Sequence, residues 1–433
     1  MEVKVIGAGL AGSEAAYQLA NQGIKVKLYE MRPVKMTDAH QTGNFAELVC
    51  SNSFRSTDIN NAVGLLKAEM VELNSLIMEA ANHASVPAGG SLAVDRVVFS
   101  KYVEDKINNH PNIEVVLEEV TNIDIDEYTV IAAGPLASSD LYNNIQAMLG
   151  DQKLHFFDAI APIVEKDSIN MDVCYVKNRY DKGEAAYINC PMDKEQYEVF
   201  YNELLNARKV QPKDFENNVF EGCMPVEVMA SRGFQTLTYG PLKPVGLERP
   251  DGTTPYAVIQ LRQDDAANSM YNIVGFQTSL AWGEQKRILN LVPGLEDINI
   301  IRYGVIHRNT YIESPKVLNN SFQVEDKPKV FFAGQISGVE GYIESAASGL
   351  NVALQIASIL KTGERHPLPV ETMMGAMARY VSTPNNSFVP MNANFGIMTE
   401  LEFKHRKKER KELYVKRSLE ALNAYMENNN ELF

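Results

Sequence analysis

The first residues that could do chemistry are three glycines near the N-terminus, Gly7, Gly9 and Gly12, in the pattern Gly-x-Gly-x-x-Gly. In a strand–turn–helix unit, the first glycine permits a tight turn and the second lets a pyrophosphate approach the backbone. The third lets the helix pack closely on the strand. A helix starting near Leu10 and Ala11 would present its unpaired N–H groups and positive dipole end to the phosphates. The spacing therefore predicts dinucleotide binding.

The segments before and after the turn have the secondary structure that dinucleotide binding requires. An apolar strand, residues 3–6, precedes the turn, and Gly23 ends the helix that follows it. Residues 24–28 predict a second strand that leads to Glu30, eighteen residues past Gly12. A carboxylate there is placed to accept hydrogen bonds from an adenosine ribose. A lone glycine motif is weak, but strand, helix and acid in register make it specific.

Two cysteines are the other candidates for chemistry, because a thiolate is a strong nucleophile. Cys50 lies among small polar residues in segment 45–56, which is typical of a site lining. Cys223 stands between Gly222 and a Met-Pro turn. From the pattern alone, a buried structural cysteine is an equally good interpretation of Cys50 and the better one of Cys223.

Composition limits the classes of protein that fit. The 433 residues are 45% hydrophobic and contain no run of eighteen apolar residues, so we expect no membrane span. The first predicted strand starts directly at the N-terminus, so we also expect no signal peptide. The four cysteines form no Cys-x-x-Cys pair, which argues against a metal site or a redox dithiol and favours the reducing cytoplasm. A net charge of −14 disfavours a chain coated with nucleic acid but permits a local basic patch.

The remaining chain predicts an α/β fold in two parts. Apolar spacing predicts one helix over residues 63–80, a second over 100–108 and strands at 113–117 and 129–135, the last containing Gly134. From 151 to 299 the alternation becomes irregular, and we interpret this stretch as a smaller inserted α+β domain. Residues 1–150 and 300–433 would then form one discontinuous cofactor domain.

A strand, a glycine turn and a helix of small residues return at residues 329–349. With the N-terminal motif, this block resembles the glutathione-reductase-type FAD proteins, in which the second turn faces the flavin end. Those proteins usually carry Asp after the Ala-Gly pair, whereas Gln335 follows Gly334 here. An amide can also serve a sugar hydroxyl, so the resemblance still implies a Rossmann-like FAD-binding domain.

The pattern Ala-Gly-Gln followed by Gly-x-x-Gly-Tyr-x-Glu resembles the glucose-inhibited division protein A group. The smaller branch, the folate- and FAD-dependent tRNA (uracil-C5) methyltransferases, is the better match. The larger branch normally adds a long helical C-terminal domain, for which no room is expected before Phe433. The resemblance runs through residues 7–16, 30–33, 47–53, 86–96, 181–191, 220–226, 261–266, 302–309, 334–349 and 390–396.

The resemblance implies methylation of a uridine at C5 in RNA. Uracil C5 becomes nucleophilic after a thiolate adds to C6, and a free thiol, with a pKa of about 8.5, needs help from its site. The one-carbon unit would come from methylenetetrahydrofolate through reduced FAD, with NAD(P)H as the reductant. The family's usual target is the T-loop uridine of tRNA, position 54. A relative acting on 23S ribosomal RNA would carry the same chemistry.

By the same resemblance Cys223 attacks C6, Cys50 is a second functional thiol near the flavin, and the ring of His307 stacks on the pterin. For His307 the alternative is a partly buried structural histidine. Tyr342 and Trp282 are candidate flavin-edge aromatic residues, although core packing suits either of them nearly as well. No pattern assigns the base that removes the C5 proton. The resemblance also implies cofactor contacts at Gly7, Gly9, Leu10, Ala11, Gly12, Glu30, Arg32, Gly134, Gly334, Gln335, Gly338, Gly341 and Tyr342.

An RNA substrate requires a cationic surface. On a helix, Lys404, Lys407, Lys408 and Lys411 would share one face and could contact phosphates, although a merely solvated face fits equally well. Partners are therefore RNA and folate, with no membrane and no metal, and the chain is expected to be a monomer or a weak homodimer.

Three other classes compete. An S-adenosylmethionine methyltransferase usually has an acid before the first glycine, where Ile6 stands here. A small-molecule flavin oxidoreductase leaves both cysteine segments unexplained, and a flavin-binding scaffold needs neither thiol.

Overall fold

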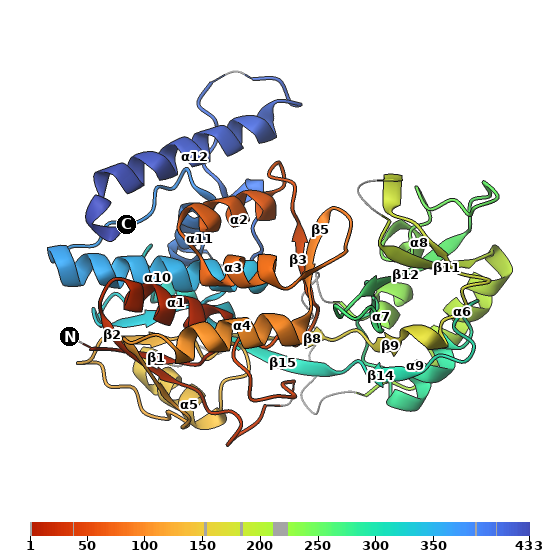
Figure 1. The fold of residues 1–433 in the computed structure, drawn as a ribbon, viewed down its shortest axis with the longest axis horizontal. Helices are drawn as coiled ribbons and strands as arrows, with labels where there is room; N and C mark the ends of the chain where they lie inside the picture. Colours follow the sequence, from red (N-terminus) through yellow and green to blue (C-terminus); the bar gives the residue numbers. More distant parts are fainter. Residues whose placement is uncertain are drawn as a thin grey trace.

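The computed structural model describes residues 2–37, 39–150, 154–181, 185–210, 224–385, 388–403 and 405–433, with backbone alone at 154–159, 181 and 306–308. Two lobes lie side by side, and both chain termini belong to the first lobe (Figure 1). The apolar core of the first lobe draws on residues between Val3 and Ile145 and between Tyr311 and Leu432. The core of the second lobe draws on residues between Val164 and Ile300.

A five-stranded sheet forms the centre of the first lobe, in the order β16-β7-β1-β2-β6 with every pair parallel. Because a parallel sheet is covered on both faces, its strands are apolar, as in the pairing of Val5 with Leu28 and Val130. This arrangement confirms the expected α/β fold class. The strands are β1 (Glu2–Ile6), β2 (Lys25–Tyr29), β6 (Ile113–Val116), β7 (Thr129–Ile131) and β16 (Val330–Phe332).

Helices of the first lobe cover this sheet, and α1, α4 and α10 lie close together (Figure 1). A small antiparallel sheet, in the order β3-β5-β4, borders the second lobe. The helices are α1 (Leu10–Asn21), α2 (Ala62–Glu72), α3 (Leu76–His83), α4 (Arg96–Asn108), α5 (Ser139–Leu149), α10 (Tyr342–Thr362), α11 (Met373–Ser382) and α12 (Arg410–Asn428). The strands are β3 (Ser53–Ser56), β4 (Ser85–Val86) and β5 (Ser91–Val94).

The second lobe is built on a six-stranded antiparallel sheet in the order β10-β11-β12-β13-β9-β14. A two-stranded ribbon, β8 (Leu154–Ala159) with β15 (Ile306–Tyr311), runs between the lobes (Figure 1). The sheet strands are β9 (Ile163–Glu165), β10 (Tyr175–Val176), β11 (Tyr187–Met192), β12 (Ala257–Gln263), β13 (Met270–Ile273) and β14 (Ile300–Arg302). The helices are α6 (Lys194–Asn206), α7 (Val226–Ser231), α8 (Thr236–Tyr239) and α9 (Trp282–Leu289).

The prediction of one helix over residues 63–80 is wrong, because the segment forms the two helices α2 and α3. Asn74 takes a left-handed backbone conformation with φ of 57°, and the hydroxyl of Ser75 accepts a hydrogen bond from the Met78 N–H. The buried carboxylate of Glu14 accepts the N–H groups of Leu76 and Ile77 at 3.1 and 2.8 Å. The apolar spacing continues across this break, so periodicity alone could not reveal it.

The helix predicted from Ser100 begins four residues earlier, at Arg96, as α4. The Asp95 carboxylate caps it by accepting the N–H groups of Val97 and Val98 at 2.9 and 3.0 Å. Such a cap satisfies N–H groups that have no partner within the helix.

The predicted helical face of lysines near the C-terminus is also wrong. Helix α12 begins at Arg410, so Lys407 and Lys408 lie in the turn before it, while Lys404 lies outside the described residues. Lysines three and four residues apart on a helix repel one another, which disfavours extending the helix through this run.

Helix α10 is long and apolar enough, by length and composition, to cross a membrane. Within its most apolar stretch, 89% of the residues are buried inside the protein. It packs against α1 so closely that a Cβ atom at Gly349 would lie 2.1 Å from the Ala11 carbonyl oxygen. Its apolar character is therefore that of a core helix.

Candidate functional site

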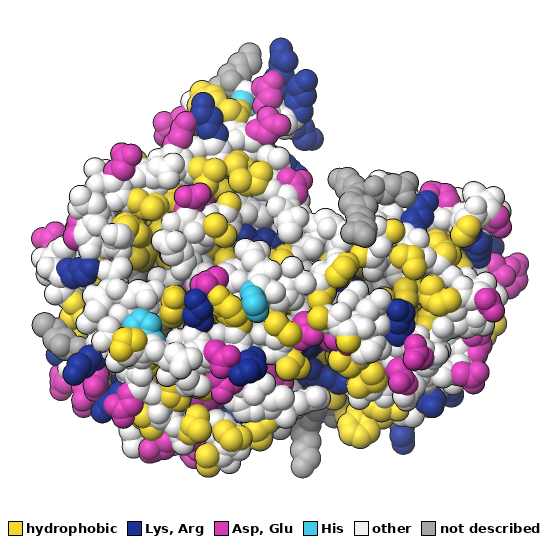
Figure 2. Space-filling model, viewed as in Figure 1, with side chains coloured by type: hydrophobic (Ala, Val, Ile, Leu, Met, Phe, Trp, Pro, Cys, Tyr) yellow, Lys and Arg dark blue, Asp and Glu magenta, His cyan; other side chains and the backbone are white. Residues whose placement is uncertain are grey.

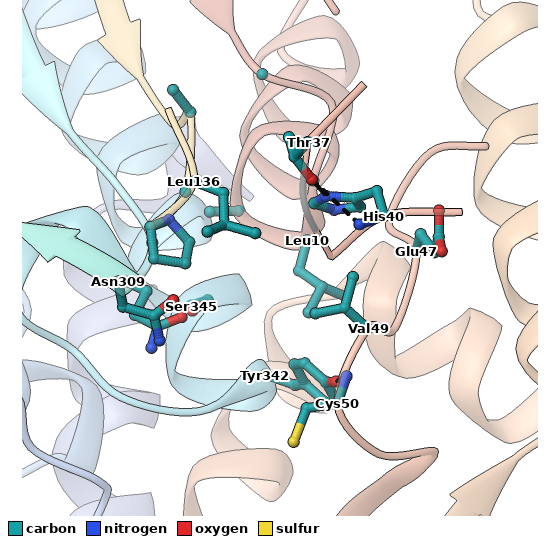
Figure 3. A pocket seen from close by; sticks show the side chains of 18 of the residues that line it. Leu10, Thr37, His40, Glu47, Val49, Cys50, Leu136, Asn309, Tyr342 and Ser345 are labelled. Atoms are coloured by element: carbon teal, nitrogen blue, oxygen red, sulfur yellow. Dashed lines mark hydrogen bonds between the residues drawn. The ribbon is translucent and has the colours of Figure 1, made fainter. Parts of the chain in front are cut away.

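A cavity of about 510 Å³ opens at the carboxyl ends of β1, β2, β7 and β16 (Figure 3), and residues of both lobes line it. In doubly wound sheets, ligands bind at this edge, beside the point where strand order reverses. The volume falls in the range of small-molecule and cofactor sites. The contributing segments include residues 6–11, 29–32, 47–55, 132–138 and 334–345 from the first lobe and residues of β12 and β13 from the second.

The glycine turn after β1 forms one wall of the cavity. Gly7 has a φ of 100°, and a Cβ atom there would lie 2.6 Å from the Ala132 carbonyl oxygen. A Cβ atom at Gly12 would lie 1.8 Å from the Gly7 carbonyl oxygen, so this glycine permits the contact between α1 and the turn. Gly9 differs, because a Cβ atom there would meet no atom within 4 Å. Gly9 caps α1 and leaves its N-terminus accessible from the cavity.

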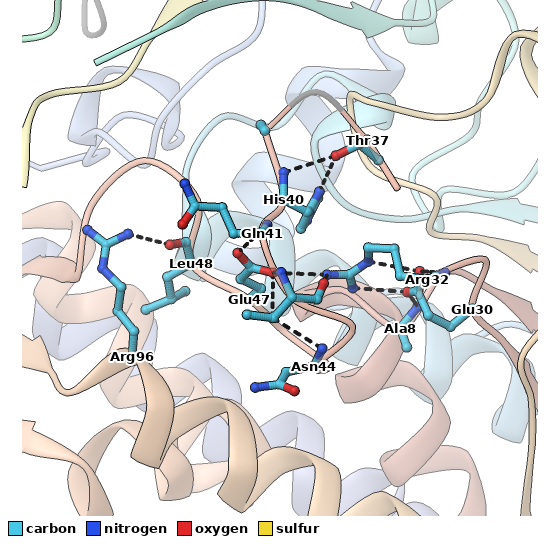
Figure 4. A network of polar contacts seen from close by, with 12 residues as sticks. Ala8, Glu30, Arg32, Thr37, His40, Gln41, Asn44, Glu47, Leu48 and Arg96 are labelled. Carbon is cyan, nitrogen blue, oxygen red and sulfur yellow. Dashed lines mark hydrogen bonds and ion pairs between the residues drawn. The ribbon is translucent and has the colours of Figure 1, made fainter. Parts of the chain in front are cut away.

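Glu30, at the end of β2, is held in a buried polar network (Figure 4). Its Oε1 accepts hydrogen bonds from the backbone N–H and Nε–H of Arg32, both at 3.0 Å. Its Oε2 accepts from the Ala8 N–H at 2.9 Å and from the Arg32 guanidinium at 3.2 Å. Burial by itself raises the pKa of Glu30, but these donors and the Arg32 charge outweigh it, so the pKa lies below its usual value.

This network affects the expected ribose contact. A carboxylate has about four lone-pair sites, and four donors already point at Glu30. A ribose hydroxyl would therefore replace or share one of the Arg32 bonds. Arg32 is also paired with Glu47 at 3.4 Å, which holds the guanidinium when one bond is exchanged.

The Cys50 segment, residues 48–52, crosses the cavity wall between the two lobes. The hydroxyl oxygen of Tyr342 accepts the N–H groups of Cys50 and Ser51 at 2.7 and 3.1 Å. Burial raises the pKa of Tyr342, so its phenol stays neutral. Figure 3 shows the thiol of half-buried Cys50 beside the Tyr342 ring. From the second lobe, the guanidinium of Arg262 contacts the side chains of Ser51 and Asn52.

The turn between β16 and α10 forms the opposite wall. Gly334 has a φ of 81°, and its N–H donates to the Ser348 hydroxyl at 2.7 Å. Gly341 has a φ of 115°, and a Cβ atom there would lie 2.2 Å from the buried carboxylate of Glu344. Glu344 is ion-paired with Arg55, which lines the cavity. Glycine at 341 thus leaves room for an ion pair between the buried Glu344 carboxylate and the partly exposed Arg55.

Most of the residues expected to contact a cofactor line this one cavity. The structure brings together Gly7, Gly9, Leu10, Ala11, Glu30, Arg32, Gly134, Gly334, Gln335, Gly341 and Tyr342, with Cys50 beside them. Gly12 and Gly338 are absent from the lining among the described residues. Gly338 packs on Phe388, whose ring would lie 2.3 Å from an added Cβ atom, so its requirement for glycine is one of packing.

Trp282 does not line the cavity, contrary to the expectation of a flavin-edge aromatic residue. Its side chain is 63% exposed at the start of α9 and stacks on Tyr303 with ring centroids 5.4 Å apart. The sequence could not place it, because an aromatic residue at a helix start suits either surface or cavity.

Three predicted residues cannot be placed by their side chains. Cys223 and Lys404 lie outside the described residues, and His307 is described by its backbone alone, on β15 opposite Asp158. Directly after Cys223, Met224 is buried, and the Val226 N–H donates to the Gln277 carbonyl oxygen at 2.7 Å. Gln277 lines the cavity.

Sequence reasoning missed several polar residues of the lining. Arg262 and Asn272 face the same side of neighbouring strands in the second lobe, Arg55 and His40 come from the first lobe, and Asn309 comes from β15. Arg262 lies in the 261–266 block of the resemblance, and membership of that block is a signal that could have pointed to a site residue. Nothing in the local pattern, however, distinguishes Arg262 from an ordinary strand residue. Among the described residues, no group of three or more His, Cys, Asp or Glu side chains could hold a metal ion.

The parallel sheet, the glycine turn and the cavity at its carboxyl edge define a dinucleotide-binding α/β protein. Residues 2–364 match the sequence profile of the family described as glucose inhibited division protein A. The chain belongs to this family.

Curated relatives match the chain over nearly its whole length. A protein of Acholeplasma laidlawii named methylenetetrahydrofolate–tRNA-(uracil-5-)-methyltransferase TrmFO is 66% identical over 98% of this chain and 99% of its own. Proteins with the same name from Bacillus mycoides and Listeria monocytogenes are each 57% identical, over 98% and 97% of this chain and 98% of their own lengths.

Solved structures of Aquifex aeolicus GidA are similar in fold. One crystal form gives a TM-score of 0.73 at 17% identity, covering 100% of this chain and 76% of that one. The other gives 0.71 at 15% identity, covering 100% and 74%.

Proposed function

We propose that this protein is a methylenetetrahydrofolate- and FAD-dependent RNA (uracil-C5) methyltransferase whose target is the T-loop uridine of tRNA, position 54. The observation that carries the proposal is the 66% identity, over 98% of the chain, to a relative named methylenetetrahydrofolate–tRNA-(uracil-5-)-methyltransferase. The location expected for such an enzyme is the cytoplasm, where tRNA and folate are found.

FAD fits the residues of the cavity. The open approach to Gly9 at the start of α1 suits a pyrophosphate, because unpaired N–H groups and the helix dipole attract anions there. Glu30 and Arg32 would orient the adenosine ribose, and the turn at Gly334–Gln335 would hold the flavin end. When bound, FAD supplies the one-carbon and hydride chemistry, with NAD(P)H as the proposed reductant.

The two thiols are assigned different tasks. Cys223 adds to C6 of uracil, which makes C5 nucleophilic, and leaves when the product forms. Cys50, beside Tyr342 on the cavity wall, serves the flavin side of the site. His307 stacks on the pterin of folate.

The source of the methyl carbon tests this proposal against an S-adenosylmethionine enzyme. Labelled methylenetetrahydrofolate with NAD(P)H should label RNA in the presence of the purified holoenzyme, whereas labelled S-adenosylmethionine should not. Transfer from S-adenosylmethionine alone would refute the proposal. Mapping 5-methyluridine in tRNA and 23S ribosomal RNA from a deletion strain then identifies the RNA. If only ribosomal RNA loses 5-methyluridine in the deletion strain, ribosomal RNA and not tRNA is the substrate.

Basic residues before α12 are the proposed RNA contact. Arg406, Lys407 and Lys408 are exposed, and Figure 2 shows Lys and Arg side chains gathered at the top of the view, where Figure 1 places this turn. Changing Lys407 and Lys408 to alanine should weaken RNA binding and reduce the slope of log affinity against log salt by about 0.7 to 0.9 per lost phosphate contact.

Binding at several salt concentrations measures this slope. The matched control changes Lys25 and Lys101, exposed lysines of β2 and α4, to alanine and removes the same charge. FAD content should stay unchanged in both variants. Equal slopes for the two variants would mean that the turn before α12 is merely solvated.

A further inference from the structure

We propose that Arg262 is a positioning residue, which sets the place of the Cys50 thiol by holding the two residues that follow it. The inference rests on the proposed function in one respect, that Cys50 takes part in turnover. It names a residue of the second lobe as a determinant of a site that lies mostly in the first.

The contacts of the guanidinium carry the inference. Arg262 lies on β12 and is 7% exposed. Its Nε–H donates to Oδ1 of Asn52 at 3.1 Å, and an NH2 hydrogen donates to the Ser51 hydroxyl at 2.7 Å. Because a guanidinium is planar and rigid, two bonds to successive residues set the orientation of the segment as well as its distance.

Further bonds make the segment a bridge between the lobes. Asn52 is fully buried, and its Nδ2 donates to the carbonyl oxygens of Val94 in the first lobe and Gln263 in the second, at 3.0 and 2.9 Å. On the other side, Tyr342 accepts the N–H groups of Cys50 and Ser51. The segment that carries the thiol is thus held between Tyr342 on α10 and Arg262 on β12.

A second arginine repeats the arrangement at the start of the segment. The Arg96 guanidinium donates to the Leu48 carbonyl oxygen at 2.5 Å and pairs with Asp264 at 3.1 Å. The end of β12 therefore reaches the Cys50 segment through Arg262, Gln263 and Asp264. Since these residues belong to the second lobe, a shift of that lobe moves the thiol relative to the cavity.

The test compares two arginines of the second lobe. Arg262→Met removes the guanidinium that is proposed to hold Ser51 and Asn52. Arg179→Met is the matched control, because the Arg179 side chain makes three hydrogen bonds within the second lobe, one of them to Gln260 on β12, and does not line the cavity. Three quantities are measured on the purified holoenzyme: FAD per chain, methylation turnover, and the alkylation rate of Cys50 by iodoacetamide, followed by peptide mass spectrometry.

Arg262→Met should keep its FAD, alkylate faster at Cys50 and turn over about 100-fold more slowly, the loss expected for a misplacement of roughly 1 Å. Arg262→Lys keeps one donor and should recover part of both changes. Arg179→Met should match the wild type in all three. Equal alkylation rates in Arg262→Met and Arg179→Met would overturn the proposal. If Cys50 of Arg262→Met is alkylated faster but the wild type methylates no RNA, the positioning role of Arg262 is supported and the proposed function is rejected.

A double-mutant cycle tests whether Arg262 acts through Ser51. If it does, Ser51→Ala combined with Arg262→Met should change the alkylation rate less than the product of the two single effects. Independent effects would overturn this route. Should Arg262→Met fail to fold, Ser51→Ala alone removes one acceptor with the guanidinium intact. Ser51→Ala should also raise the alkylation rate of Cys50, and an unchanged rate would refute the positioning role of Arg262.

Discussion

Replacing Cys223 with alanine is expected to abolish both methylation and the covalent bond between enzyme and RNA. A nucleophile that adds to C6 is joined to the substrate partway through each cycle, whereas a packing cysteine never is. An RNA carrying 5-fluorouridine cannot lose a proton from C5, so it should trap this adduct as a slowly migrating band on denaturing gels. Turnover should fall by roughly 10⁴-fold or more, as expected when a nucleophile is removed.

The other cysteines provide the comparison. Cys174→Ala removes a buried thiol of the second lobe that lies 3.4 Å from Cys190, and it should leave the band intact. Cys50→Ala should slow turnover through the flavin side of the site. Cys223→Ser should not restore activity, because a hydroxyl is far less ionised at neutral pH than a thiol. If Cys223→Ala methylates RNA at the wild-type rate, Cys223 is not the nucleophile and Cys50 becomes the candidate.

Two glycines of the same motif should respond to valine in opposite ways. Gly9→Val should give a folded, colourless protein, because an added Cβ atom meets nothing within 4 Å and the φ of −74° suits any residue. The new side chain would instead occupy the approach of the pyrophosphate. Gly12→Val should fail to fold, since its Cβ atom would lie 1.8 Å from the Gly7 carbonyl oxygen and push α1 away from the turn.

Visible flavin absorbance and far-UV circular dichroism separate these outcomes. Gly9→Val should lose the flavin bands and keep the dichroism of the wild type. A yellow Gly9→Val protein with full FAD content would mean that the cofactor does not approach the backbone there. A soluble, helical Gly12→Val protein would contradict the packing role of Gly12.

The sequence determined the parts of this protein whose interactions are local. The strand, turn and helix around Gly7, Gly9 and Gly12 are contiguous, so their spacing alone indicates the β1–α1–β2 unit and the carboxylate at Glu30. The fold class follows from this unit, and the resemblance to one family follows from several long sequence blocks. The apolar period does not determine helix boundaries, because Asn74 and Ser75 end one helix and begin another without interrupting it.

The tertiary structure decided which distant residues meet. Ser51 and Arg262 are separated by 211 positions, and no periodicity shows that a strand of the second lobe reaches the Cys50 segment. Trp282 looked suited to a flavin edge, yet packing leaves it exposed on α9. Glu30 remains the expected ribose acceptor, and packing adds the distant Ala8 N–H to the three donors that Arg32 supplies from two positions away. Local patterns record propensity and spacing, but long-range contacts depend on how whole sheets and helices pack, and this packing assembled the cavity.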